Sequence, residues 1–144
     1  MPRSLTSEEL DSLLALDIPA RLATLEADGF PRITPLWFVW EDGAFWMTSV
    51  PHQPHVRNLE RDGRAAICID VEDRGPAGGV RRHRQAKGRG LARLRVDEEG
   101  AWTRRITLKY VAGEEGANAA ARRSSIPRVV IELRPERLVA SASS

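Results

Sequence analysis

The single cysteine of this 144-residue chain, Cys68, excludes a disulfide within one copy of the protein. No run of apolar residues approaches the ~20 that a membrane-spanning helix needs, and no charged segment followed by an apolar one opens the chain as in a signal peptide. These absences predict a cytoplasmic protein that does not span a membrane. The length and the 42% share of hydrophobic residues predict one domain, residues 1–144, with a packed core.

Lysine is almost as scarce as cysteine. Lys87 and Lys109 are the only two, so 22 − 2 = 20 of the Lys and Arg residues are arginine. Arginine binds phosphate as a planar fork, but the codon bias of a GC-rich genome gives the same excess, and we weight that explanation more heavily. The sequence also lacks a P-loop, a Gly-x-Ser-x-Gly motif and a histidine pair with metal-ligand spacing, so we expect no metal.

What the chain does contain is a succession of short β-type runs. The triplets at 27–29 and 41–43 each combine Asp with Gly, which favours tight hairpin turns. Thr6 and Glu9 form a capping-box pattern ahead of an apolar helical face. The predicted elements are helices over 7–16, 55–61, 101–111 and 114–123, strands over 20–26, 31–40, 44–49, 64–71 and 129–133, a mobile loop over 73–82, a strand that follows 81–84 and ends at Val96, and a polar tail after Pro135. They indicate an α+β protein, mainly β with short helices, built as a closed or half-open antiparallel barrel.

Two details of these strands are specific predictions. Cys68 lies in an apolar run and is expected in the core rather than as a nucleophile. Gly88 and Gly90 share one face of their strand, and their lack of a side chain permits another backbone to approach closely.

The predicted strand over 31–40 is apolar on both faces, with Trp37 on one and Phe38 on the other. Such a strand is covered on both faces. In a small barrel one face fills the interior, so the other has to meet a second subunit, a ligand or both. Pro35 cannot donate a ladder hydrogen bond, which indicates an edge or a bulge.

Arg32 and Thr34 add polar groups to the face that carries Phe38. That mixture suits a planar conjugated ring, which needs an apolar wall and a few polar partners. The alternative is a barrel core with a dimer interface, in which Trp37 and Trp40 are the anchors. Both interpretations hold together if a ligand lies at a subunit junction.

The loop from residue 48 to 58 combines groups that can bind a phosphate. It holds the predicted start of a helix, whose first N–H groups are free to donate. An ordinary surface turn tolerates the same residue types, and on the residues alone we rank that interpretation slightly higher. The hydroxyls and the groups that can carry positive charge are Thr48, Ser49, His52, His55 and Arg57.

Several segments, taken in order, resemble the pyridoxamine 5′-phosphate oxidase-like flavoproteins. They are RLATLEADGFPRITPLWFVWEDGAFWMTS, VRNLERDGRAAICID, KGRGLARL, the Lys109-Tyr110 pair and VVIELRPERL. Each motif is loose, but their order makes the resemblance fairly specific from about Arg21 onward. It implies a six-stranded, antiparallel, Greek-key-like split β-barrel that forms a homodimer. It also implies that FMN, or the related deazaflavin coenzyme, binds at the dimer interface; some members bind heme instead.

The resemblance also implies roles for single residues. Arg32 and Thr34 would lie along the phosphate and the ring edge of the cofactor. Thr48 and Ser49 would contact the phosphate. No catalytic residue is assigned. The full set of cofactor-binding residues, in which Pro35 and Trp37 flank the ring, is Arg32, Thr34, Pro35, Trp37, Thr48, Ser49, His52, His55, Arg57, Asn58 and Lys87.

One position departs from the family's pattern. Where the family usually has a lysine before the RNL segment, this chain has His55. Lysine is a permanent cation, whereas a histidine near pH 7 is mostly neutral unless a phosphate raises its pKa. Phosphate binding would then be weaker, depend on pH, or rely on the positive charge of Arg57 and the cluster at 81–84. The C-terminal substrate-binding extension of full pyridoxamine 5′-phosphate oxidases is not found, so we do not expect that activity.

Three functions follow, in this order. The first is an oxidoreductase in which FMN or the deazaflavin exchanges a hydride with a small molecule that enters near the loop at 73–82. The second is a protein that binds or sequesters the cofactor without turnover. The third is a nucleic-acid contact through the arginine-rich face, ranked last because no aromatic residue interleaves with those arginines.

Overall fold

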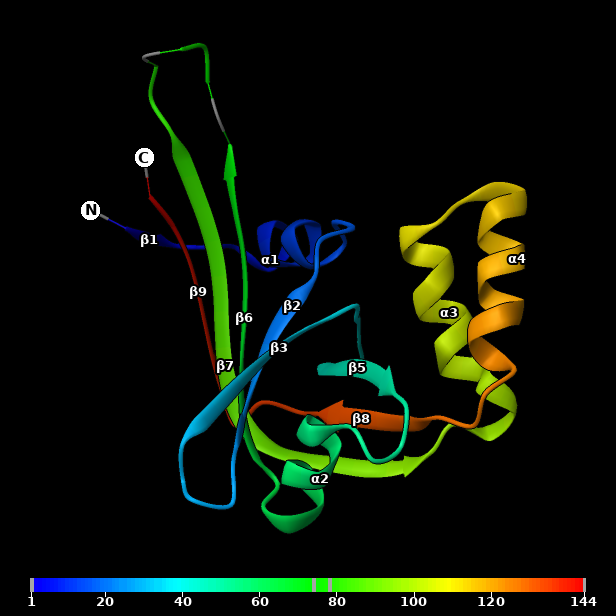
Figure 1. The fold of residues 1–144 in the computed structure, drawn as a ribbon. Helices are drawn as coiled ribbons and strands as arrows, with labels where there is room; N and C mark the ends of the chain where they lie inside the picture. The colour runs from blue at the N-terminus through cyan, green and yellow to red at the C-terminus, as the bar shows by residue number, and fades with distance from the viewer. Residues whose placement is uncertain (1, 74, 78, 144) are drawn as a thin grey trace.

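The computed structural model describes residues 2–73, 75–77 and 79–143, with antiparallel strands as the dominant element (Figure 1). The strand order is β3-β2-β6-β7-β8-β5-β4, with β9 beside β7 and β1 beside β9. This confirms a mainly β fold with short helices. In chain order the elements are β1 (Arg3–Ser4), α1 (Ser7–Leu14), β2 (Ala20–Leu25), β3 (Pro31–Leu36), β4 (Val39–Glu41), β5 (Ala44–Ser49), α2 (Pro54–Arg61), β6 (Arg64–Asp73), β7 (Arg82–Val96), a 3-10 turn (Glu98–Gly100), α3 (Ala101–Tyr110), α4 (Gly113–Ser124), β8 (Val129–Leu133) and β9 (Arg137–Ser143).

The longest strand, β7, is shared by two parts of the sheet. Its first part pairs with β6 and β9, and from Ala92 onward it pairs with β8. Figure 1 shows β7 bending from the long ribbon with β6 toward β8. A Cβ at Gly90 would lie 2.9 Å from the Arg134 carbonyl oxygen, and one at Gly88 would lie 3.2 Å from that of Arg137. The predicted close approach of a second backbone is confirmed.

The core lies between the sheet, α1 and α2, and β5 is buried along its whole length. Phe45 and Met47 belong to this core, whereas Ala44 and Trp46 pack with Trp102 of α3 in a second cluster. β5 therefore runs between the core and the helices, with one face toward each. Other fully buried side chains of the core are Leu13, Leu22, Ile69, Ile131 and Leu133.

The predicted continuous strand over 31–40 is wrong, because the structure breaks it into β3 and β4. The backbone N–H of Phe38 donates to the Tyr110 hydroxyl at 3.1 Å. The carbonyl of Phe38 accepts from Lys109 Nζ at 3.0 Å, and Lys109 also donates to the Leu14 carbonyl at 2.9 Å. Side chains of α3 thus replace the sheet as partners of this backbone. The predicted edge position is confirmed, since β3 ends the strand path.

Three other expectations need correction. The polar tail is β9, which pairs with β7 (Val139 opposite Lys87) and with β1, because β7 still has an open edge there. The predicted loop at 73–82 is shorter, because β6 and β7 pair as far as Asp73 and Arg82; residues 74 and 78 lie outside the described residues. Cys68 is half-buried rather than core, because strand alternation turns its neighbours on both sides inward instead.

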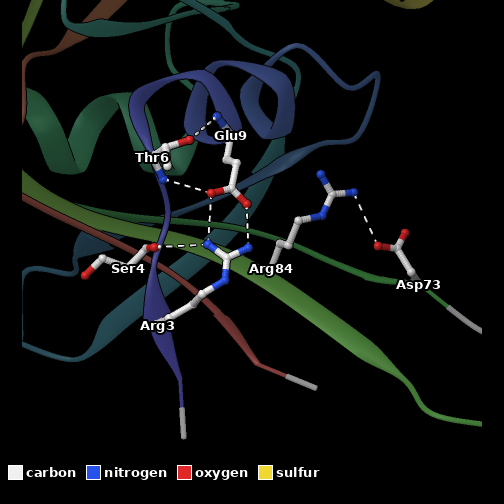
Figure 2. A network of polar contacts seen from close by, with 6 residues as sticks. All are labelled: Arg3, Ser4, Thr6, Glu9, Asp73 and Arg84. Carbon is white, nitrogen blue, oxygen red and sulfur yellow. Dashed lines mark hydrogen bonds and ion pairs between the residues drawn. The ribbon is translucent and has the colours of Figure 1, made fainter.

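Residues before α1 are fastened by the predicted capping box. Glu9 N–H donates to Thr6 Oγ1, and Thr6 N–H donates to Glu9 Oε1, each at 3.1 Å. Figure 2 shows Arg3 placing two amino groups on the same carboxylate, at 2.9 and 2.7 Å. The acid holds the helix start and β1 together. None of the helices in the described ranges is long and apolar enough to cross a membrane.

Replacing Lys109 with Met should weaken the rise of the unfolding free energy with pH above neutral pH. Burial lowers the pKa of Lys109 to about 8, whereas an unfolded lysine titrates near ~10.4. Between these values the unfolded chain holds a proton that the folded chain has lost, so the free energy of unfolding rises with pH. The rise stays below the limiting ~1.4 kcal/mol per pH unit, because water screens the half-buried amine.

Urea denaturation between about pH 7 and about pH 10 measures this effect. Lys87→Met is the matched control, because Lys87 is exposed on β7. The unfolding free energy should rise with pH in the wild type and in the control, and more weakly in Lys109→Met. Equal slopes in all three proteins would contradict the assignment.

Candidate functional site

Helix α2 turns one face toward the sheet. It begins at Pro54, which suits the first helical position because its nitrogen needs no acceptor. The N-cap residue, Gln53, makes no side-chain capping bond, so the N–H groups of the first turn depend on other acceptors. His55, Asn58 and Leu59 are buried, which puts two polar side chains between the helix and the strands.

A buried hydrogen bond joins α2 to the end of β5. Nε2 of His55 lies 2.8 Å from Oγ of Ser49, and each residue is only 6% exposed. Burial lowers the pKa of His55, and the positive charge of Arg32 lowers it further. The ring is therefore neutral at pH 7, with a proton on one of its two nitrogens.

A second set of contacts fixes Asn58. Its amide nitrogen donates to Oγ1 of Thr24 at 3.0 Å, and its oxygen accepts from Arg61 at 2.7 Å. Arg61 also donates to the Leu25 carbonyl at 3.0 Å. Thr24 stands opposite Arg32 in the register of β2 and β3, so Arg32 emerges on the same side of the sheet as α2.

The donors around the start of α2 fit a phosphate group. A phosphate offers only acceptors, and this place offers a hydroxyl (Ser49), a guanidinium (Arg32) and the N–H groups of a helix start. Nε of Arg32 donates to Glu26 at 2.7 Å, and its two terminal amino groups are the donors that a ligand could use. We call Arg32, Ser49, His55 and the first turn of α2 the α2 cluster.

Thr48 lies on the other face of β5 from Ser49. Its Oγ1 is 2.9 Å from Oγ1 of Thr103 in α3. The carboxylate of Asp97 accepts the Thr103 hydroxyl at 2.7 Å, the Thr103 N–H at 3.0 Å and the Trp102 N–H at 2.9 Å. Asp97 thus caps α3, and Thr48 ties that cap to the sheet.

Trp37, which the resemblance places beside a cofactor ring, stacks on its own chain. Its ring lies 4.6 Å from that of Tyr110, almost parallel at 3°. The Arg123 guanidinium lies 4.8 Å from the Trp37 ring centroid and donates to Thr107 Oγ1 at 2.6 Å. Trp37 is therefore engaged by α3 and α4.

The structure therefore gathers only part of the predicted set. Arg32, Ser49, His55 and Asn58 surround α2, while Thr48 and Trp37 have partners elsewhere. The cofactor-binding roles of all these residues stay predictions, and the rest of the predicted set lies as follows. Thr34 is half-buried on the side of Arg32, and Pro35, His52, Arg57 and Lys87 are exposed.

The basic residues at 81–84 face acidic residues of β6. Figure 2 shows one such pair, Arg84 with Asp73, near the ion pair of Arg3 with Glu9. Ion pairing compensates part of this positive charge. It therefore weakens the two hypotheses that need the charge to be free, a nucleic-acid contact and the binding of a cofactor phosphate by these residues. The pairs are Arg81–Glu72 at 3.2 Å, His83–Asp70 at 3.1 Å and Arg84–Asp73 at 3.5 Å.

The outward face of the sheet carries an open depression of about 390 Å³. Its lining includes Ala23, Ala66 and Leu91. Ile33, which is 69% exposed, stands opposite Ala23 in the register and extends the same face. Arg89 adds positive charge at its edge. The face is thus mostly apolar and exposed in a single chain.

Thr24, Asp97 and Thr103 are among the buried polar residues that were not found from the sequence. Thr24 lies on the inward face of β2, where a hydroxyl needs a hydrogen-bond partner. The alternation of inward and outward side chains along the strand could therefore have indicated a buried polar contact at this position. Asp97 comes shortly before a predicted helix, which is typical of a cap. For Thr103, nothing in the local pattern separates it from an ordinary helical threonine.

Residues 6–141 match the family model described as pyridoxamine 5′-phosphate oxidase. The chain belongs to the pyridoxamine 5′-phosphate oxidase family. The resemblance predicted from the ordered motifs is thereby confirmed. No curated protein matches the sequence significantly.

Solved structures similar to this member of the family differ in what their names say they bind. An F420 reductase is 25% identical with a TM-score of 0.67, covering 89% of this chain and 94% of that one. The FAD and heme binding protein from Mycobacterium smegmatis is 19% identical with a TM-score of 0.73, covering 99% and 73%. HutZ, the heme storage protein from Vibrio cholerae, is 17% identical with a TM-score of 0.69, covering 94% of each. The shared property is the fold.

Replacing Asp97 with Asn should destabilise the protein by ~1–3 kcal/mol, the usual effect of leaving a buried donor without an acceptor. One of the two carboxylate oxygens becomes an NH₂ group, which meets the donors of Trp102 or Thr103. Urea denaturation measures the change. The exposed neighbour Glu98, changed to Gln, is the control and should be within experimental error of the wild type. If the unfolding free energy of Asp97→Asn equals that of the wild type, the cap is not needed.

Proposed function

We propose that this protein is an oxidoreductase that binds FMN or a deazaflavin coenzyme and exchanges a hydride with a small-molecule substrate. The observation that carries the proposal is the donor set of the α2 cluster, which suits the phosphate group of such a cofactor. Family membership supports it, because the resemblance implies a flavin-type cofactor for proteins of this fold. A similar solved structure is described as an F420 reductase.

In this proposal the chain binds and orients the cofactor. Arg32, Ser49 and the first turn of α2 hold the phosphate by charge-assisted hydrogen bonds. Thr34, two residues along β3 from Arg32, lies along the ring edge. When bound, the flavin-type ring supplies the two-electron chemistry.

A second candidate is a protein that binds a cofactor without turnover. It is favoured by two similar structures, which are described as a FAD and heme binding protein and as a heme storage protein. The two candidates differ in one property, the transfer of electrons to a second molecule.

One series of measurements separates these candidates. FMN, FAD, the F420 deazaflavin and heme are each titrated into the purified protein and followed by absorbance or fluorescence. Binding of FMN or the deazaflavin at micromolar levels, followed by reduction with a nicotinamide donor and reoxidation by a small-molecule acceptor, is the expected result. Binding without any electron transfer selects the second candidate. If neither FMN nor the deazaflavin binds, the oxidoreductase proposal fails.

Arg32→Gln should weaken FMN binding by about 10- to 100-fold, the range for losing one charge-assisted hydrogen bond of ~1.5–3 kcal/mol. Riboflavin, which lacks the phosphate, should lose no affinity. Arg105→Gln is the matched control, because Arg105 on α3 is also an exposed arginine paired with a carboxylate, that of Glu41 at 2.7 Å. Equal losses for FMN and riboflavin would place Arg32 away from the phosphate.

We also propose a homodimer formed through the outward face of the sheet. In a single chain this face exposes Ile33 and Leu91, 69% and 59% accessible, around the depression beside Ala66. Contiguous apolar surface of this kind marks an interaction site. A second copy is the occupant that the resemblance implies.

Ala66→Glu should shift the protein toward a monomer, because it puts a charge into the face that the dimer would bury. Sedimentation velocity over a range of concentrations measures the state of assembly. Ala117→Glu, on the exposed side of α4, is the control and should remain dimeric. A wild-type protein that sediments as a monomer at all concentrations would refute the dimer.

A further inference from the structure

His55 stands where the resemblance leads us to expect a lysine, and the structure shows how this changes the α2 cluster. A lysine would carry its charge with or without a ligand. The His55 ring is 6% exposed and bonded to Ser49, at 2.8 Å between Nε2 and Oγ. The two residues share one hydrogen bond, so the protonation of one decides what the other can donate.

The hydroxyl of Ser49 has a single proton. If Nε2 of His55 carries no proton, it accepts that of Ser49, which then offers only lone pairs to a ligand. If Nε2 carries a proton, the ring donates to Ser49, and the hydroxyl proton is free to be donated outward. A fully ionised phosphate has only acceptors, so it needs the second arrangement. The ring reaches that arrangement either as the neutral tautomer with its proton on Nε2 or as the cation, and the negative charge of the phosphate favours the cation.

We propose that the phosphate group of the cofactor binds together with one proton, which His55 takes up from solvent and passes on as a hydrogen bond through Ser49. No covalent bond forms or breaks. The proton moves from water to the imidazole ring, and Ser49 keeps its own proton while turning it toward the phosphate. The inference rests on the proposed function and adds the regulation of its binding site by pH.

The charges around His55 support proton uptake on binding. From β3, Arg32 repels a charged ring, and Glu26 pairs with Arg32 at 2.7 Å. From α2, Arg61 is held by Asn58 at 2.7 Å. Burial and Arg32 keep the pKa of His55 below its usual value. A bound phosphate brings negative charge beside the ring and raises that pKa.

The sign of the pH dependence follows from these two states. Between the lowered pKa of His55 in the free protein and its higher pKa in the complex, binding consumes a proton. The dissociation constant therefore rises with pH in that window, by at most about tenfold per pH unit. A lysine at the same position would bind phosphate without this dependence near neutral pH.

The test is a titration with FMN from about pH 5.5 to about pH 8.5, followed by flavin fluorescence. His55→Lys keeps a permanent charge, and His55→Gln keeps polarity without a proton to take up. The phosphate of FMN itself titrates near ~6, and this contribution is shared by all three proteins. We expect the wild-type dissociation constant to rise several-fold more between pH 6 and 8 than that of either variant. Riboflavin should show no such difference.

A second measurement needs no variant. The chain has only three histidines, His52, His55 and His83, so ring NMR signals can follow each of them. FMN should raise the pKa of His55, which the pH dependence of its ring signals with and without FMN measures.

The outcomes separate the two proposals. FMN binding with the same pH profile in wild type and His55→Gln, or a His55 ring that stays neutral in the complex, overturns proton uptake and leaves the proposed function standing. Absence of binding by FMN and by the deazaflavin at every pH overturns both.

Discussion

The burial of β5 on both faces is the constraint on which the rest of the structure depends. Because successive side chains of a strand alternate, β5 has to satisfy the core on one side and α3 on the other. Phe45 and Met47 fill the core, while Trp46 stacks on Trp102 at 4.3 Å between ring centroids. The same alternation sends the hydroxyl of Thr48 to the Asp97 cap and that of Ser49 to His55. Two adjacent hydroxyls therefore have separate tasks, one in holding α3 and one in the α2 cluster.

The sequence predicted those features of the fold that arise from neighbours in the chain. Local patterns predicted the α-helices, most of the strands, the hairpin turn at Asp42 and Gly43, and the capping box at Thr6. They did not predict the break after β3, because its cause is a pair of side chains 71 and 72 residues away. β9 was missed because its alternation of small polar and apolar residues is weak, and only its pairing with β7 makes it a strand.

The candidate site was predicted with the same limits. Residue type and order were enough to find Arg32, Ser49 and His55, because they belong to motifs that resemble a family. The sequence does not give the direction of each side chain, so it does not separate Thr48 from Ser49 or show that Trp37 stacks on Tyr110. The cofactor-binding roles of Thr48 and Trp37 stay predictions. Lys109 and Tyr110 show the converse. The pair was noted as a motif, and the structure gives its role, which is to bond the backbone of Phe38.

The pairing of β1 with β9 places Arg3 opposite Ala142, so contacts join residues almost a whole chain length apart. Loop-closure entropy makes such a contact among the last to form during folding. β1 has two residues and few neighbours to hold it, whereas β7 pairs with three strands. Native-state hydrogen exchange would therefore show the pairing of β1 with β9 as the first to open and β7 as the slowest to exchange. Among the described strands β1 pairs only with β9, so its opening leaves the hydrogen bond between His55 and Ser49 in the α2 cluster intact.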